Sequence, residues 1–302
     1  MIHVDNLRVQ YGDFCAVQDI SFSVSQQEIF GIIGPNGAGK TSAIECVEGL
    51  RSPSGGDVSV LGLNPWKDRK QLHQLIGVQL QDTAYQDNAK VWELCQLFSF
   101  LYPHPSPYGK LLDTMGLADK RNSYISSLSG GQRQKLSIVL AMIPNPKVVF
   151  LDELTTGLDP HARHQMWDLL KQLREEGLTI VIISHFMDEV EAICDRVAVM
   201  DKGRIVSQGP IAQVSSKFSL ASKITFTAPQ LQAGELEGIS NVSSVEISKG
   251  VVTVLCQGDD CLPEILSYLR DKDIPYSNLS VSRPGLEEVF LRLVEESKAH
   301  SG

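Results

Sequence analysis

A glycine-rich stretch near the N-terminus carries residue types whose spacing suits phosphate binding. The segment Gly34-Pro35-Asn36-Gly37-Ala38-Gly39-Lys40-Thr41, followed by Ser42, matches the pattern G-x-x-x-x-G-K-[ST]. Glycines let the backbone curl so that successive N–H groups point inward at phosphate oxygens, and a helix that starts at Lys40 adds its positive N-terminal end. Lys40 would reach the β- and γ-phosphates of a nucleotide, and the Thr41 hydroxyl would ligate Mg²⁺. A plain Gly-rich turn is disfavoured because an apolar strand precedes the segment and a helix follows it.

Two carboxylates end a second apolar run. Residues 148–151 read as a buried strand, and Asp152 and Glu153 follow it directly. An acid at the end of a strand beside a phosphate loop can orient the Mg²⁺ shell, and the next acid can polarise a water molecule for attack on the γ-phosphate. Two solvated acids at a strand end would be common by themselves, but the Gly-rich loop in the same domain favours the catalytic interpretation.

A second helix start with anion-binding character lies at 128–132. Ser129, Gly130, Gly131 and Gln132 precede an apolar helix that Pro144 would terminate. Because one phosphate site needs one such cradle, a second suggests a phosphate shared between two chains. The alternative is that Ser129 simply caps the helix, and the residues alone leave this choice open.

These segments together resemble the nucleotide-binding subunits of ABC transporters, in family order over about residues 2–212. Residues 128–132 look like the signature motif, which in that family contacts ATP held by the opposite protomer of a head-to-tail dimer. Gln81 matches the Q-loop glutamine, Asp159 the D-loop, and His185 the switch histidine that contacts the γ-phosphate. Tyr11 matches the aromatic residue that stacks on adenine.

The resemblance implies an active ATPase that uses ATP and Mg²⁺. It assigns the catalytic roles to Glu153, His185 and Gln81, and the Mg²⁺ ligands to Thr41, Gln81 and Asp152. The residues that it places against ATP are Tyr11, Gly34, Pro35, Asn36, Gly37, Ala38, Gly39, Lys40, Thr41, Ser42, Ser129, Gly130, Gly131, Gln132 and Asp159. One position departs from the family, because Leu154 stands where Pro is usual after the glutamate, which affects the local turn more than the carboxylates.

The C-terminal end resembles a narrower group. Residues 282–291 are similar to the ending of exporter ATPases of the daunorubicin-resistance type, which serve drugs, antibiotics and polysaccharides. Leu286, Val289, Phe290 and Leu293 form an apolar stripe at helical spacing. The simplest interpretation of this stripe is that it packs on the sheet of its own domain.

The elements that must position these residues predict an α/β fold. Apolar runs at 28–33, 147–151 and 178–184 read as buried strands, and 90–143 reads as largely helical. The resemblance implies a P-loop NTPase of ABC type, with a RecA-like core, a helical signature subdomain at about 85–145 and an N-terminal antiparallel β region. We expect this ATP-binding domain to span 1–218 and a small α+β accessory domain to span 219–302.

Composition limits the partners. The 302-residue chain has a formal net charge of -9, which disfavours nucleic-acid binding, and six scattered cysteines that fit a reduced, cytosolic protein. No stretch approaches the length of a membrane span, and the N-terminus lacks the features of a signal peptide. These features indicate a cytoplasmic protein. The resemblance implies that a separate transmembrane permease holds it at the cytoplasmic face of the membrane, and that it pairs with a second ATP-binding subunit in a homodimer.

Two other functions compete with a transporter subunit. A soluble ABC ATPase acting on ribosomes or DNA would usually carry two cassettes or a long coiled coil, and the sequence shows one cassette and no long heptad run. A non-hydrolysing regulatory subunit is disfavoured because Glu153 and His185 are both present. The transported substrate is not encoded in the motifs, because it contacts the permease.

Overall fold

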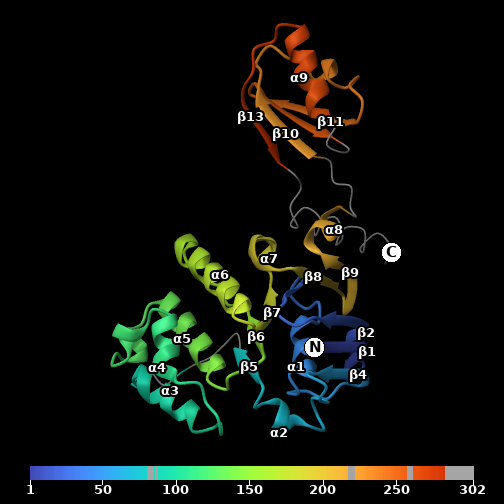
Figure 1. The fold of residues 1–302 in the computed structure, drawn as a ribbon. Coiled ribbons are helices and arrows are strands. Elements are labelled where there is room, and N and C mark those ends of the chain that lie inside the picture. The colour runs from blue at the N-terminus through green and yellow to red at the C-terminus, as the bar shows by residue number, and fades with distance from the viewer. Residues whose placement is uncertain (80–84, 86–87, 217–221, 257–260, 283–302) are drawn as a thin grey trace. The chain divides into compact units, whose positions relative to one another are not determined.

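The structure is a computed structural model of the chain and describes residues 1–79, 85, 88–216, 222–256 and 261–282 (Figure 1). The chain divides into two compact units, Met1–Pro210 and Ile211–Gly302. Each unit has a hydrophobic core of its own. Gln81 and the stripe from Leu286 to Leu293 lie outside the described residues.

A six-stranded sheet in the order β5-β6-β7-β3-β8-β9 forms the centre of the first unit. Its strands are β3 (Ile29–Ile33), β5 (Ile76–Gln79), β6 (Val148–Asp152), β7 (Thr179–Ser184), β8 (Arg196–Asp201) and β9 (Arg204–Pro210). Pairing is parallel throughout except that β9 is antiparallel to β8. The apolar runs of β3, β6 and β7 are buried, as parallel strands covered on both faces require. Because these three strands are neighbours, their carboxyl ends meet at one edge of the sheet.

An antiparallel sheet lies against one face of the central sheet. It has the order β2-β1-β4, from β1 (Ile2–Tyr11), β2 (Phe14–Val24) and β4 (Gly55–Val60). Helix α1 (Lys40–Val47) belongs to the same core, and α2 (Arg69–Leu72) follows β4 in the chain. Alternate residues of β1 point into this core, and Val181 and Ile183 of β7 meet it from the central sheet.

Helices cover the opposite face of the central sheet, where Ile180 and Ile182 point. They are α3 (Val91–Ser99), α4 (Tyr108–Thr114), α5 (Gly130–Met142), α6 (Pro160–Glu175) and α7 (Met187–Ile193), with short 3₁₀ turns at Ala118–Lys120 and Ile125–Ser127. The β1, β2 and β4 sheet and the α3–α5 helices thus lie on opposite sides of the unit (Figure 1). Leu136 and Leu170 bring α5 and α6 into one core with β6.

The second unit is a small α+β layer. Its antiparallel sheet has the order β11-β12-β10-β13, from β10 (Ser222–Thr227), β11 (Val242–Ser248), β12 (Val251–Cys256) and β13 (Ser277–Ser282). Helix α8 (Ile211–Ser216), a 3₁₀ turn (Ala233–Glu235) and α9 (Cys261–Asp271) complete the described part. Phe226 and Val254 of the sheet pack with Ile265 and Leu269 of α9.

Candidate functional site

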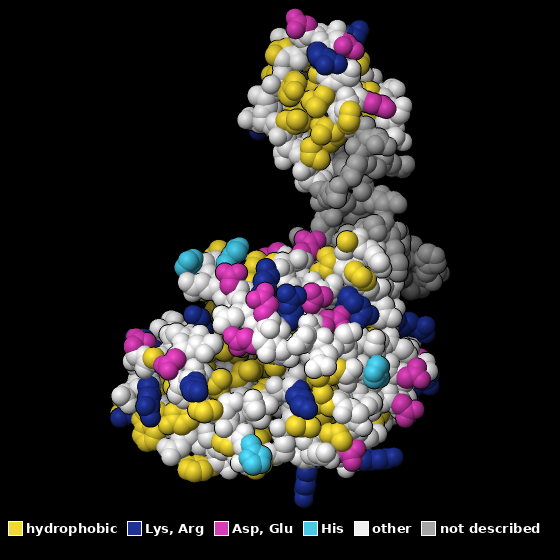
Figure 2. All heavy atoms as spheres, in the orientation of Figure 1, with side chains coloured by type: hydrophobic (Ala, Val, Ile, Leu, Met, Phe, Trp, Pro, Cys, Tyr) yellow, Lys and Arg dark blue, Asp and Glu magenta, His cyan; other side chains and the backbone are white. Residues whose placement is uncertain are grey.

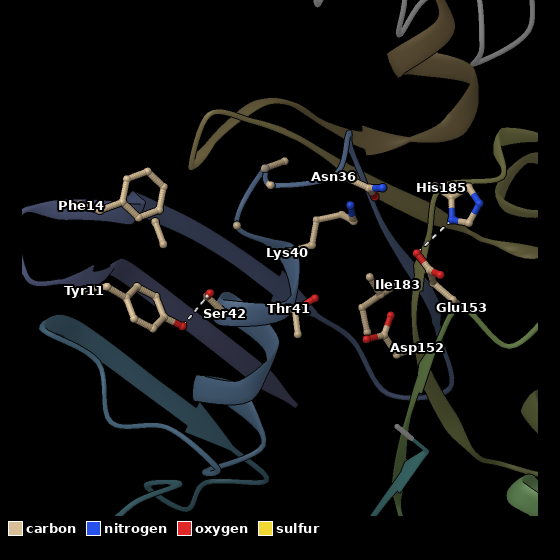
Figure 3. Close-up of a pocket in the computed structure, with 14 residues that line it drawn as sticks. Tyr11, Phe14, Asn36, Lys40, Thr41, Ser42, Asp152, Glu153, Ile183 and His185 are labelled. Atoms are coloured by element: carbon tan, nitrogen blue, oxygen red, sulfur yellow. Dashed lines mark hydrogen bonds and ion pairs between the residues drawn. The ribbon is translucent and has the colours of Figure 1, made fainter. Parts of the chain in front are cut away.

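An open cleft of about 480 Å³ lies at the carboxyl edge of the central sheet. Four parts of the chain line it: the β1–β2 hairpin, the loop from β3 into α1, the end of β6 and the end of β7 (Figure 3). The lining residues are Tyr11, Phe14, Ala16, Asn36, Gly37, Ala38, Gly39, Lys40, Thr41, Ser42, Asp152, Glu153, Ile183 and His185. The structure therefore brings together most of the phosphate, metal and catalytic residues that the sequence predicts.

The loop before α1 is shaped by glycine. Gly39 caps the helix with a φ of 95°, and a Cβ there would collide with the carbonyl oxygen of Ala16. The Lys40 ammonium curls back over the loop and donates to the carbonyl oxygens of Gly34 at 2.8 Å and Pro35 at 3.0 Å. Burial lowers the pKa of Lys40, while the charges of Glu153 and Asp152 act in the opposite direction. The loop thus presents a desolvated cation where a phosphate would lie.

The acidic side of the cleft is built at the ends of β6 and β7. Burial raises the pKa of Asp152 to about 6, with the charge of Glu153 adding to the effect and that of Lys40 opposing it. Glu153 has a φ of 50°, and its backbone N–H donates to the Ile183 carbonyl at 2.9 Å. Its Oε1 lies 3.0 Å from His185 Nδ1 (Figure 3). The pairing joins two of the three predicted catalytic side chains across neighbouring strands.

Comparison with known proteins decides the family. The family model described as ABC transporter matches residues 17–156. Over 294 residues the chain is 35% identical to Nod factor export ATP-binding protein I of Burkholderia orbicola (strain AU 1054), with 95% of each chain covered. The chain belongs to the ABC transporter family. It is an ATP-binding subunit and an ATPase, as the sequence predicts.

A second relative matches nearly the whole chain, and two solved structures match about 70% of it. The linearmycin resistance ATP-binding protein LnrL of Bacillus subtilis (strain 168) is 28% identical over 304 residues, covering 97% of this chain and 98% of the relative. Among solved structures, cbiO1 from Clostridium perfringens is 28% identical with a TM-score of 0.65, over 72% of this chain and 91% of that chain. The ADP conformation of the ATP-binding cassette MJ1267 is 26% identical with a TM-score of 0.62, over 70% and 91%. These likenesses confirm the α/β P-loop fold of ABC type.

Two aromatic rings of the β1–β2 hairpin face the cleft of this ABC subunit. The Tyr11 hydroxyl lies 3.0 Å from Ser42 Oγ, and the Arg51 guanidinium lies 4.6 Å from the centre of the Tyr11 ring. Phe14, which the sequence interpretation missed, also lines the cleft and has 65% of its surface exposed. The signal available in the sequence was a pair of aromatics flanking the tight turn formed by residues 12 and 13.

The second predicted anion site lies elsewhere. Ser129 caps α5, where its Oγ accepts from the Gln132 N–H at 3.3 Å and its own N–H donates to Gln132 Oε1 at 3.0 Å. Asp159 caps α6 and accepts from the Ala162 N–H at 2.9 Å. Within the described part of the chain, neither the 129–132 segment nor Asp159 lines the Lys40 cleft.

The remaining sequence predictions concern metals and membranes. Gln81 lies outside the described residues, so its position relative to the cleft stays a prediction. In the residues that the structure describes, His, Cys, Asp and Glu side chains form no group of three able to hold a metal ion by themselves. None of the described helices combines the length and the apolar character needed to cross a bilayer.

Proposed function

We propose that two copies of this subunit close head to tail over two Mg²⁺-ATP molecules and thereby drive a separate transmembrane permease. The supporting observation is the division of the predicted ATP contacts. Lys40, Asp152 and Glu153 share one cleft, whereas the Ser129 helix start is absent from the described lining of that cleft. A second protomer would supply that helix start, with Gly130, Gly131, Gln132 and Asp159, to the γ-phosphate side of the first.

The cleft residues divide the work of hydrolysis. Tyr11 stacks on adenine, while residues 34–42 surround the phosphates with backbone N–H groups and the Lys40 charge. Glu153 accepts a proton from the attacking water, because it is a carboxylate at the strand end beside the phosphate loop. His185, which lies 3.0 Å from Glu153, orients that carboxylate and contacts the γ-phosphate.

The cleft fits a hard divalent cation. The Thr41 hydroxyl and the Asp152 carboxylate both face it with oxygen donors, the ligand type that Mg²⁺ prefers. The raised pKa of Asp152 also marks a site where negative charge is costly until a cation offsets it. We propose Thr41, Asp152 and Gln81 as the ligands. When bound, Mg²⁺ would neutralise charge on the phosphate oxygens.

The transport partner is a permease, and the proposed direction is export. The relatives named for linearmycin resistance and Nod factor export support export. An apolar groove of about 200 Å³ between Leu50, Val78 and Tyr102 offers the permease a docking place. Hydrophobic side chains gather beside it over α3 and α4 (Figure 2), and Phe100 of that region is 79% exposed. Docking there would hold the subunit at the cytoplasmic face of the membrane.

We also propose the boundaries of the two domains along the chain. Residues 1–218 would form the ATP-binding domain, with its helical subdomain at about 85–145, and 219–302 the accessory domain. The compact unit Met1–Pro210 supports the ATP-binding domain, because the cleft lies within it, although helix α8 (Ile211–Ser216) groups with the second unit.

Glu153→Gln tests the shared-site function. The amide keeps the shape of the carboxylate but accepts no proton, so hydrolysis should fall by about two orders of magnitude while Mg²⁺-ATP still binds. The variant should elute as a dimer with Mg²⁺-ATP and as a monomer with ADP. Hydrolysis at the wild-type rate would reject Glu153 as the base. A monomer in saturating Mg²⁺-ATP, both alone and with the co-purified permease, would reject dimer closure.

A further inference from the structure

A buried acid lies directly behind the catalytic pair. Glu189, in the first turn of α7, is fully buried, and its Oε2 accepts a hydrogen bond of 2.6 Å from Ser184 Oγ. The same Ser184 oxygen accepts from the Phe186 N–H at 3.0 Å. Ser184 and Phe186 are the two chain neighbours of His185, so Glu189 fixes the backbone on both sides of the histidine.

The Glu189 carboxyl also faces the turn that follows Glu153, the other member of the catalytic pair. Glu189 Oε1, Thr155 Oγ1 and Trp167 Nε1 are all buried, and none makes a hydrogen bond of standard geometry. Burial raises the pKa of the Glu189 carboxyl, and donation from Ser184, then from the Thr155 hydroxyl and the Trp167 indole, opposes that rise. Thr155 lies two residues after Glu153, and Trp167 lies on α6, the helix that Asp159 begins. The Glu189 cluster (Glu189, Ser184, Thr155 and Trp167) thus joins the turn after β6, the end of β7 and helix α6.

Three buried polar atoms without a standard hydrogen bond lie at one point, and such groups are costly to bury, so their placement calls for an explanation. The Thr155 hydroxyl comes from the turn that follows Glu153, and the Glu189 carboxyl also holds Ser184 at the end of β7, so the carboxyl links these two turns. The cluster is therefore suited to hold the two turns at a fixed separation.

We propose that Glu189 is a positioning residue for ATP hydrolysis, which sets Glu153 and His185 relative to one another by holding Ser184 and facing Thr155. The inference rests on the proposed roles of Glu153 and His185. Glu189 itself is sealed from the cleft and touches no reacting atom. Its contribution is to keep the Glu153 carboxylate aimed at the attacking water, where displacement of about 1 Å is enough to slow a reaction strongly.

Glu189→Ala and Glu189→Gln test this role through the split between kcat and KM. In the alanine variant kcat for ATP should fall by about tenfold or more, with KM and nucleotide affinity within about twofold of wild type, because the phosphate loop is untouched. The glutamine variant should lie between, since its amide oxygen can still accept from Ser184. Asp188→Asn is the matched control. It neutralises the neighbouring acid, whose side chain is 58% exposed, and should leave kcat within about twofold.

Thr155→Val is a second variant, which keeps the proposal testable if Glu189→Ala does not fold. It removes a buried hydroxyl that makes no standard hydrogen bond, so the fold should survive while kcat falls at unchanged KM. A wild-type kcat in Thr155→Val and in whichever Glu189 variant folds would overturn the proposal.

The same Glu189 substitution made in a His185→Ala protein distinguishes a positioning role from a general loss of stability. With His185→Ala already present, Glu189→Ala should reduce kcat further by less than it does in wild type, because one of the two groups that it positions is gone. Full additivity would overturn the proposal. A failure of the proposed function can be told apart from a failure of this inference. In the first case the Glu153→Gln and His185→Ala variants would themselves hydrolyse ATP at the wild-type rate.

Discussion

At the scale of single residues, two aromatic rings are available to the adenine base, and their surroundings differ. Tyr11 is held by the Ser42 hydroxyl at 3.0 Å and by Arg51 on one ring face, whereas Phe14 is 65% exposed. A fixed ring loses less entropy on stacking. Tyr11→Ala should therefore weaken ATP and GTP binding alike, by about tenfold, the usual scale of one base–aromatic stack.

Phe14→Ala is the matched comparison, and it should cost less than about threefold in affinity, measured by calorimetric titration of both nucleotides. A larger loss for Phe14→Ala than for Tyr11→Ala would reverse the assignment and make Phe14 the stacking ring.

Asp152 allows a prediction about the metal. Asp152→Asn removes a desolvated charge that also repels Glu153, so the melting temperature of the nucleotide-free protein should stay equal or rise. The same change removes a proposed Mg²⁺ ligand. Mg²⁺ should then no longer increase ATP affinity, while binding without Mg²⁺ is kept. A titration in which Mg²⁺ still strengthens ATP binding as in wild type would place the metal elsewhere.

Individual site residues were predictable from sequence where a motif fixes their spacing. Lys40, Asp152 and His185 converge on one cleft because the strands before them are apolar runs that pair in parallel. Phe14 was not predicted, since an exposed aromatic in a hairpin carries no signature of its own. Glu189 was not predicted either, because only the fold shows that Ser184 and Thr155 meet it.

At the scale of elements, the turn from β3 into α1 depends on left-handed backbone at Gly39. Gly39→Ala should destabilise the protein by about 1–3 kcal/mol, since it combines a φ of 95° with a Cβ that collides with the Ala16 carbonyl. Gly37→Ala is the control, because φ there is 81° but nothing lies within 4 Å of the added Cβ. Thermal unfolding should show a clearly larger loss for Gly39→Ala, and equal losses would contradict the collision.

Elements differed in how far the sequence revealed them. The apolar strands were predicted to within a residue or two, because burial on both faces requires continuous Val and Ile. Residues 197–200 and 204–206, separated by the turn residues 201–203, predict a hairpin; β8 and β9 form it, and β9 extends further, to Pro210. Strands β4 and β13 were missed, since one begins with two glycines and the other is half serine and exposed throughout. Pairing with distant strands makes them regular, and that pairing leaves no local signal.

At the scale of the whole molecule, the family and the fold class were predictable from the motifs, whereas the head-to-tail arrangement of protomers rests on the family resemblance and stays a prediction. The motifs lie in one order along the chain, and one unit carries all of them. The placement of α5 relative to α1 decides which motifs share a cleft within one chain. It also decides which motifs need a second chain to complete the site. The structure keeps Ser129 out of the described lining of the Lys40 cleft, which supports the proposed exchange between protomers.

Mixing two inactive variants tests that exchange directly. Lys40→Ala removes the phosphate-binding charge, and Ser129→Arg fills the helix start with a bulky side chain, so each homodimer should be inactive at both sites. In a head-to-tail heterodimer of the two, one site carries both changes, while the other pairs an intact Lys40 with an intact Ser129. With random association and independent sites, an equal mixture should recover about a quarter of wild-type ATP turnover.

The control is a chain that carries both changes, mixed with either single variant, because no site in that mixture is intact and no activity should return. Recovery should also depend on time and concentration, as exchange of protomers requires. If the mixture of single variants stays as inactive as this control while size exclusion shows that heterodimers form, Lys40 and Ser129 do not serve one ATP from opposite chains. The proposed head-to-tail site would then be wrong, although the cleft around Lys40 would still bind nucleotide.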